Sequence, residues 1–574
     1  MSAQNSGPGV PAAGARRLLG THQLFWLGAV LAMLILAVMA SQRIYHTSSD
    51  PRGTLLVSQA LVQHGTLKLD SYGSQVLDNL GYVIHRKNGH AYNYFPLGTA
   101  VVSTPFVAIA LGLGFDMVQD EPLIQMAITA LVALLIAALL YQTARLYLPQ
   151  TPSLLLTGLC WFGSALASSL GTALWSHDFA WVFSSAAILL TLRRRSAGWL
   201  SGAGLIGLCL FLAYLCRPTL ALLAPCLLLY CFTQDKKRAL VAALTLGLLL
   251  LGFMGWSQGE FGQILPDYYL PKRLESSDSG DALYGNLFSP ARGLLVFSPF
   301  LLVSLLLTLG LAPRNRRIAT LGLLTLVWPL LHWLSISQFP HWWAGWSFGA
   351  RLMVDALPGL FVGLFSALGA LERRRRLAYA AVFISGLLAI YINTYQGLFN
   401  PYAVQWNVEP NVDQHPEYLF DWRYPQFLHN QPRHETRLAE FNSQQLPAFS
   451  GQVEIPYDST QAVFEHFYGL ETGFRWSEGQ EAKLSFVLEP QALQGEFNLT
   501  AGFLGDQRLE ITLNGSAVYQ GRPRGGEREI RFVAPTQLLR PGINTLGFSL
   551  PDAHAPASED PRIMAMAFRK LSLR

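Results

Sequence analysis

Residues 24–40, LFWLGAVLAMLILAVMA, are followed by polar chain that contains His46-Thr47-Ser48-Ser49-Asp50-Pro51-Arg52. An apolar run of this length predicts a helix long enough to cross most of a bilayer. The run is also longer than the apolar core of about 7–15 residues found in a cleaved signal peptide, so a retained anchor is favoured. The sequence therefore places the Asp50 carboxylate at the rim of a membrane, where an ionised group needs a partner or a role.

The composition of the chain also indicates a membrane protein. Of its 574 residues, 51% are hydrophobic and only 13% are charged, whereas soluble domains carry about 25% charged residues. The net charge of +5 comes from basic clusters between apolar runs, which is typical of cytoplasmic loops and not of a nucleic-acid-binding surface. The cysteines lie in apolar runs without metal-ligand spacing, so we expect neither a zinc site nor a disulfide framework.

The apolar runs and basic clusters together predict a topology. Candidate spans are 24–41, 97–114, 123–143, 153–172, 178–192, 199–215, 218–233, 239–256, 294–312, 318–336, 353–371 and 377–394. The basic clusters are Arg16-Arg17, Arg145, Arg193-Arg194-Arg195, Lys236-Lys237-Arg238, Arg314 with Arg316-Arg317, and 373–376. If all clusters are cytoplasmic, an even number of crossings must separate each consecutive pair.

Only the interval between Arg16-Arg17 and Arg145 breaks that rule, because it contains three candidate spans. The run 97–114 is interrupted by Gly and Pro and lacks a basic flank, so we expect it to be a juxtamembrane or re-entrant helix. This leaves about eleven crossings, with the tail 1–22 inside and the C-terminal part outside. The outer-face loops are then 42–122, 257–293 and 337–352.

Several polar residues gather on this outer face. His177 and Asp178 begin an apolar run, as a functional pair or as part of a Ser176–Asp178 helix cap. Arg217 lies between two apolar runs, where it either reaches lipid headgroups or binds a phosphate. Three tryptophans within 342–346 are denser than an interfacial aromatic belt requires, which favours a platform for sugar rings.

The arrangement of these motifs resembles the GT-C superfamily of multi-span glycosyltransferases, which use polyprenyl-phosphate-linked sugars. Bacterial aminoarabinose transferases and protein mannosyltransferases are members of this type. The motifs that carry the resemblance are Ser49-Asp50-Pro51 with 55–61, the stretch 90–98, Trp175-Ser176-His177-Asp178, the stretch 342–351, and 413–427. Many relatives have an Asp-Glu pair where this chain has Asp50-Pro51. A two-carboxylate metal clamp is therefore not indicated, and we expect no cofactor, although a divalent metal stays open.

The resemblance implies a site and a location. Asp50 would be the general base, with His177 and Asp178 orienting the acceptor or stabilising charge on the sugar. The residues that would bind the donor phosphate are Arg217, Lys272, Arg292 and Arg351. Those that would bind the sugar or the acceptor are Tyr92, Tyr94, Tyr268, Trp342, Trp343 and Trp346. The partners would be membrane lipids, a polyprenyl-phosphate sugar and a glycan, lipid or protein acceptor, in a bacterial inner membrane with the C-terminal domain periplasmic.

The C-terminal part differs in composition from the apolar part at 23–394. A connector at 395–450 precedes runs of alternating polar and apolar residues, with turns at Asn514-Gly515 and Pro541-Gly542. This pattern predicts an antiparallel β-sandwich over 451–574. It resembles a jelly-roll carbohydrate-binding module, and a structural cap or a partner-docking domain fits equally well.

Three other functions fit parts of the pattern. A transporter or flippase of lipid-linked sugars would share the membrane part and the anion-binding residues without needing a base. A glycan polymerase or ligase would use a long lipid-linked glycan as donor. A structural membrane protein with a sensor domain is disfavoured by the clustering of acids and arginines on one face.

Overall fold

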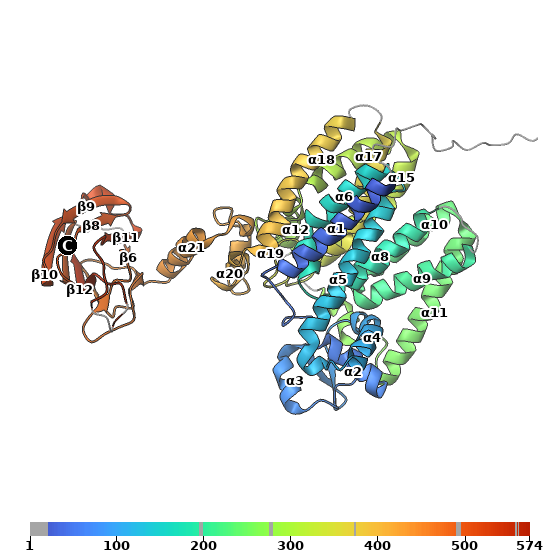
Figure 1. Cartoon of the computed structure of the whole chain (residues 1–574), viewed down its shortest axis with the longest axis horizontal. Coiled ribbons are helices and arrows are strands. Elements are labelled where there is room, and N and C mark those ends of the chain that lie inside the picture. Colours follow the sequence, from blue (N-terminus) through green and yellow to red (C-terminus); the bar gives the residue numbers. More distant parts are fainter. Residues whose placement is uncertain are drawn as a thin grey trace, which may run out of the picture. The chain divides into compact units, whose positions relative to one another are not determined.

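The computed structural model describes residues 21–193, 199–274, 279–371, 375–489, 495–556, 560 and 562–574. The described residues do not include the tail up to residue 20. They also exclude part of the basic clusters at 193–195 and 373–376, so those predicted cytoplasmic charges lie outside the structure described. The chain divides into two compact units between Asn430 and Gln431. Figure 1 shows a helical first unit and a second unit rich in strands.

The first unit is helical apart from one hairpin. Its helices are α1 (Thr21–Ser41), α2 (Thr54–His64), α3 (Ser74–Leu80), α4 (Leu97–Gly112), α5 (Met117–Ala144), α6 (Gln150–Phe162), α7 (Ala165–Ser168), α8 (Ser176–Leu192), α9 (Trp199–Cys216), α10 (Leu223–Gln234), α11 (Lys236–Phe261), α12 (Ser279–Phe288), α13 (Leu294–Phe297), α14 (Phe300–Leu311), α15 (Arg316–Gly322), α16 (Trp328–Ile336), α17 (Leu357–Ala370), α18 (Arg375–Ile390), α19 (Gly397–Phe399) and α20 (Tyr402–Val408). Short helical turns that shape the site are η3 (Pro218–Leu222), η4 (Asp267–Tyr269) and η8 (Arg351–Ala356).

The described part of the chain contains fewer long apolar helices than the sequence predicted. Five are long and apolar enough to cross a membrane, or six if a pair bent by 48° forms one span, against about eleven expected crossings. The long helices are Met117–Ala144, Lys236–Phe261, Arg316–Ile336, Arg351–Ala370 and Arg375–Phe399, and the bent pair is Gln150–Phe162 with Ala165–Thr172.

The other predicted spans form apolar helices of 10–17 residues. Breaks in the helix explain part of the shortening. The predicted run 294–312 breaks into α13 and α14 at Ser298-Pro299, because Pro299 has no N–H to donate and restricts the residue before it. The predicted run 97–114 is one of the short helices, α4, with Pro105 inside it.

The loop between α1 and α4 folds back on itself and packs on the ends of other helices. Strands β1 (Ile84–Lys87) and β2 (His90–Asn93) form a hairpin closed by Asn88 and Gly89, whose φ angles are 52° and 81°. Two consecutive left-handed residues fit the right-handed twist of a two-residue hairpin. Gly98 in α4 lies so close to the end of α9 that a Cβ there would meet the Cys216 backbone nitrogen at 2.4 Å. This close packing brings the residue after Cys216, Arg217, beside the first loop.

The second unit contains α21 (Gln431–Gln444) and two five-stranded antiparallel sheets. One sheet has the order β10-β7-β12-β3 with β5 beside β12, and the other has the order β4-β6-β11-β8-β9. The strands are β3 (Val453–Pro456), β4 (Ala462–Glu465), β5 (Arg475–Trp476), β6 (Glu481–Leu488), β7 (Glu496–Phe503), β8 (Leu509–Leu513), β9 (Ser516–Gly521), β10 (Gly526–Val533), β11 (Gly542–Ser549) and β12 (Met566–Leu573).

Alternation along these strands builds one core between the two sheets. In β8 the burial alternates strictly, with Leu509, Ile511 and Leu513 buried in a cluster that draws on both sheets. The predicted Asn514-Gly515 turn joins β8 to β9, with φ angles of 51° and 85°. The C-terminal β-sheet region expected from the sequence is therefore present, as a β-sandwich.

Candidate active site

Two cavities of the first unit meet at one group of residues. The larger measures about 750 Å³ and the smaller about 540 Å³. The residues that line both are Asp50, Tyr82, Ala344, Gly345, Arg351 and Asp413. These residues form the boundary between the cavities, so a group bound in one is adjacent to a group bound in the other.

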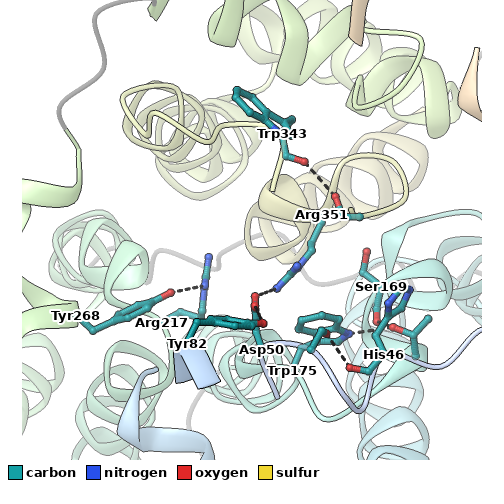
Figure 2. Close-up of polar contacts among 12 residues, drawn as sticks. His46, Asp50, Tyr82, Ser169, Trp175, Arg217, Tyr268, Trp343 and Arg351 are labelled. Atoms are coloured by element: carbon teal, nitrogen blue, oxygen red, sulfur yellow. Dashed lines mark hydrogen bonds and ion pairs between the residues drawn. The ribbon is translucent and has the colours of Figure 1, made fainter. Parts of the chain in front are cut away.

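An ion pair between Asp50 and Arg351 lies at this boundary. Arg351 Nη2 donates to Asp50 Oδ2 at 2.9 Å, and the Tyr82 hydroxyl donates to Oδ1 at 3.0 Å. The guanidinium also stacks on the Trp175 ring, 3.7 Å from its centroid, which adds a cation–π contact. Figure 2 shows Asp50 between Arg217 and Tyr268 on one side and Trp175, His46 and Ser169 on the other.

The charges of this pair follow from their surroundings. Burial acts to raise the pKa of Asp50, but the charge and hydrogen bond of Arg351 and the Tyr82 hydroxyl outweigh it, so the pKa lies below its ordinary 3.8. Burial, reinforced by the positive charge of Arg351, lowers the pKa of His46 from 6.5 to about 4. At neutral pH, Asp50 is therefore a carboxylate and His46 an uncharged imidazole.

The start of α5 holds the loop that carries Asp50. Glu121 accepts hydrogen bonds from the Gly53 and Leu55 amides at 2.8 and 2.9 Å, and Gln125 donates to the Pro51 carbonyl at 3.2 Å. Gly53 has a φ of 75° and precedes α2, so the carboxylate accepts amides that the first turn of α2 leaves without helical partners. These bonds fix the backbone on the C-terminal side of Asp50.

Arg217 lines the larger cavity and is oriented by a buried acid. Its Nε donates to Asp355 Oδ2 at 3.3 Å, and its Nη1 lies 3.5 Å from the Tyr268 hydroxyl. On the far side of Asp355, the other carboxylate oxygen is 2.8 Å from His177 Nδ1. Asp355 is fully buried and His177 only 1% exposed, so the two form a buried support behind Arg217.

The structure thus brings together part of the predicted site. Asp50, Arg217, Arg351, Tyr94 and Tyr268 line the larger cavity. Trp346 joins Asp50 and Arg351 around the smaller one. The other predicted residues lie outside both linings: His177, Asp178, Lys272, Arg292, Tyr92, Trp342 and Trp343.

The His177-Asp178 pair separates in the structure. His177 reaches Asp355, whereas Asp178 is 1% exposed in the first turn of α8 and its Oδ2 has no hydrogen-bond partner among the described residues. Adjacent residues on a helix point about 100° apart, so one of them can support the cavity while the other faces the helix packing. Asp178 therefore lines neither cavity.

Arg292 is buried in a hydrogen-bond network and does not face a cavity. Its guanidinium donates to the carbonyls of Trp343, Gly345 and Ala291 and to the side chains of Gln426 and Asn407, at 2.7–2.9 Å. These bonds use all five of its N–H donors. Burial lowers the pKa of Arg292 to about 9, which leaves it charged at neutral pH. Arg292 therefore shapes the loop 342–349, and no donor is left for a phosphate.

The three tryptophans of this loop have three different environments. Trp342 is 5% exposed and packs on Phe420. Trp343 donates its Nε1–H to Asp413 Oδ1 at 2.7 Å. Trp346 is 46% exposed at the smaller cavity. A platform of three rings is therefore absent, and one ring is available to a ligand.

Two further predicted residues belong to contacts beside the larger cavity. The Tyr92 hydroxyl donates to Glu260 at 2.6 Å, which joins the hairpin to α11. Lys272 lies 3.3 Å from Asp267, and its side chain is 62% exposed. Lys87 contacts the same carboxylate at 2.8 Å, so Asp267 links the hairpin to the loop that carries Tyr268.

Sequence reasoning missed Tyr82, Asp355 and Asp413 as site residues. Asp355 was detectable, because it is an ionisable residue inside the apolar run 353–371 and such residues are functional candidates by default. Asp413 begins the stretch 413–427 that carries part of the resemblance, but the sequence assigned it no role, and no sequence signal singled out Tyr82. No group of three or more metal-ligating side chains occurs among the described residues.

The chain is similar to solved structures at low sequence identity. No protein-family model and no curated protein matches the chain. Among solved structures, ArnT from Cupriavidus metallidurans bound to undecaprenyl phosphate is 14% identical, with 75% of this chain and 82% of that chain covered and a TM-score of 0.41. The Archaeoglobus fulgidus oligosaccharyltransferase tethered with an acceptor peptide is 12% identical, with 70% of this chain and 59% of that chain covered and a TM-score of 0.43.

A third match is the CBM36-1 domain of a multidomain xylanase from the hindgut metagenome of Trinervitermes trinervoides. It is 14% identical and covers 22% of this chain and 97% of that domain, with a TM-score of 0.15.

Proposed function

We propose that this protein is a membrane glycosyltransferase that moves a sugar from a polyprenyl-phosphate donor to an acceptor hydroxyl. The observation that supports this most directly is the Asp50–Arg351 pair at the boundary of two cavities. A transfer reaction needs two sites that share a reacting centre, and a base and a cation at that centre.

The larger cavity is the proposed donor site. Arg217 and Arg351 offer positive charge to the phosphate, and Tyr94 and Tyr268 line the same space. Leu222, Leu270 and Phe339 supply apolar lining, as a polyprenyl chain would require. Guanidinium groups suit this role because they bind phosphate oxygens with two parallel hydrogen bonds.

Asp50 is the proposed general base. As the acceptor oxygen forms its bond to the anomeric carbon of the sugar, its proton moves to the Asp50 carboxylate. The bond from that carbon to the phosphate oxygen breaks, and the phosphate leaves with the electron pair towards Arg217 and Arg351. A single displacement of this kind inverts the anomeric carbon. His177 and Asp355 act behind Arg217 as positioning residues.

The proposed cellular setting is the inner membrane of a bacterium. About eleven crossings, with the C-terminal β-sandwich on the periplasmic side, would combine the long helices with the shorter apolar ones. The acceptor would then be a glycan, lipid or protein on the periplasmic face.

The test is transfer by the purified full-length protein in nanodiscs, with a panel of undecaprenyl-phosphate sugars and a cell-envelope extract as acceptor source. Transfer that Asp50→Asn abolishes supports the proposal. A flippase or a lipid-linked-sugar transporter would instead move donor across the bilayer in both proteins, which is measured in proteoliposomes because they separate two compartments. Absence of transfer from every lipid-phosphate sugar, with donor translocation retained in Asp50→Asn, overturns the proposal.

A further inference from the structure

The smaller cavity has a chemical character of its own. Hydroxyl side chains line it from separate parts of the chain: Ser48, Ser49, Ser168, Ser169, Thr172 and Ser347. Several of them are already oriented by the backbone, such as Ser49, which donates to the His46 carbonyl at 2.8 Å. Hydroxyls can both donate and accept, so such a lining matches a ligand that itself carries many hydroxyls.

The charges around this cavity disfavour an anionic ligand. Among the described lining residues, Arg351 is the one permanent cation, and Asp50 already pairs with it. His46 is uncharged at neutral pH because its pKa is about 4. Asp413 adds a carboxylate to the lining. A phosphorylated headgroup would meet this carboxylate and an arginine shared with Asp50 and the donor phosphate.

Trp346 and Asp413 supply a ring face and an acceptor on the same cavity. The Trp346 ring is 46% exposed, and its Nε1 lies 3.4 Å from Asn411 Oδ1, which holds the edge of the ring. Asp413 receives bonds from Trp343 at 2.7 Å and from His341 at 3.1 Å, both on Oδ1. Within the part of the chain that the structure describes, both bonds fall on Oδ1, which orients the carboxylate and leaves Oδ2 for a ligand hydroxyl.

We propose that the smaller cavity binds a neutral saccharide, which is the acceptor, with Trp346 stacking on a sugar ring and Asp413 Oδ2 accepting hydrogen bonds from its hydroxyls. This inference rests on the proposed transfer function, and it selects a glycan from the acceptor classes that the function alone leaves open. An acceptor hydroxyl in this position is adjacent to Asp50, because Asp413 and Asp50 line the same boundary.

The experiment measures saccharide binding without any donor. Saturation-transfer NMR on the full-length protein in nanodiscs uses a panel of neutral di- and trisaccharides built from common hexoses and N-acetylhexosamines. Parallel samples contain a bis-phosphorylated glucosamine disaccharide and a serine- and threonine-containing peptide. The variants are Trp346→Ala, Asp413→Ala and Arg217→Ala. Trp422→Ala is the matched control, because Trp422 is 54% exposed and lines neither cavity.

We expect at least one neutral saccharide to bind, with an affinity about tenfold weaker in Trp346→Ala and in Asp413→Ala. Binding should be unchanged in Trp422→Ala and retained in Arg217→Ala, since Arg217 lines the other cavity. If no saccharide of the panel gives a signal that depends on Trp346, the inference is wrong. It is equally wrong if the phosphorylated disaccharide or the peptide gives the Trp346-dependent signal in place of the neutral sugars.

The outcome for the transfer function is read separately. If saccharide binding depends on Trp346 but no lipid-phosphate sugar is transferred, the proposed binding site is supported and the proposed transfer function is wrong. If transfer depends on Asp50 but no saccharide binding depends on Trp346, the transfer function is supported and the proposal of a neutral glycan acceptor is wrong.

Discussion

The Nη2 atom of Arg351 lies 2.9 Å from Oδ2 of Asp50, although 301 residues separate the two in the chain. The same guanidinium rests on Trp175, so one side chain joins the first loop, the start of α8 and η8. In the proposed reaction, a donor phosphate that approaches Arg351 competes with Asp50 for it. Donor binding would then release the carboxylate from its ion pair and make it a stronger base.

Replacement of Asp50 by Asn should nearly abolish transfer. The amide keeps the shape of the side chain but cannot take up the acceptor proton, and a general base contributes about 10²–10⁴-fold to a rate. We expect a loss of this size in kcat, measured with a radiolabelled lipid-phosphate sugar. The control is Asp78→Asn, an exposed acid in the same loop, which should transfer at the wild-type rate. Equal losses in the two variants would contradict the role of Asp50.

The pH dependence of transfer should change when Arg351 is neutralised. The base works only when deprotonated, so activity falls as pH drops through its pKa. Arg351 holds the pKa of Asp50 below 3.8, and burial alone would raise it. Wild-type kcat/KM should therefore be flat down to mildly acidic pH, whereas Arg351→Gln should lose its residual activity at a distinctly higher pH. A profile with an unchanged acid limb would show that another group is titrating.

Arg217→Lys should weaken donor binding more than it slows chemistry. Lysine keeps the charge but lacks the planar fork that can contact Asp355 and a phosphate together. We expect KM for the lipid-phosphate sugar to rise about tenfold. Arg86→Lys, an exposed arginine of the hairpin, is the matched control and should leave KM unchanged.

Asp355→Asn tests whether the buried acid acts through Arg217. It should raise the same KM, because the asparagine no longer balances the guanidinium charge, and it should leave acceptor binding unaltered. A lower kcat with an unchanged donor KM would rule out this positioning role.

Glu121→Gln should slow transfer without weakening donor binding. The carboxylate holds the Gly53 and Leu55 amides, and the carboxamide offers one acceptor oxygen where two are needed. A displaced base of this kind costs up to about 10²-fold in rate, so we expect kcat to fall by about tenfold or more. Asp120→Asn removes a charge from the same turn of α5 and should have little effect. If both variants behave alike, the effect belongs to helix charge and not to the Asp50 loop.

Arg292→Ala should destabilise the protein. Truncation removes five hydrogen bonds and leaves buried acceptors without donors, at a cost of at least about 3 kcal/mol. The expected readout is a large fall in thermal unfolding temperature in nanodiscs, with normal donor affinity in the fraction that stays folded. Arg423→Ala, at an exposed arginine paired with Asp421, should shift the unfolding temperature very little. A selective rise in donor KM at wild-type stability would instead restore Arg292 to the phosphate site.

The sequence allowed prediction of the residues whose chemistry is visible locally. Asp50 lies shortly after one apolar run and Arg217 lies between two others, so both are charged residues at a membrane that need a partner or a role. Arg292 and Arg351 look alike in sequence, each at the end of an aromatic outer loop. What separates them is the set of acceptors from distant residues, Asn407 and Gln426, that converge on Arg292 alone.

The remaining differences also have physical causes. Fewer helices than predicted are long enough to span alone, because an apolar run does not show where its helix breaks, as the run 294–312 does at Ser298-Pro299. The three tryptophans do not form the predicted platform, because spacing in a loop does not determine side-chain direction and the Trp342 side chain is buried. The β-sandwich was predictable because strict alternation and an Asn-Gly turn are both local signals.

The Arg292 network has a consequence for biosynthesis. The loop 342–349 forms part of the wall of both cavities. Gln426 donates to its Ser347 carbonyl at 3.1 Å and accepts from its Gly349 amide at 3.2 Å, and Asn407 donates to the Ser347 carbonyl at 3.2 Å. A nascent chain that has not yet reached these residues has inserted almost all of its apolar helices but cannot close the boundary between its two cavities. The hydrogen bonds that hold this loop therefore form late in translation. Under the proposed function, we expect a chain that terminates before Gln426 to insert its apolar helices but to transfer no sugar.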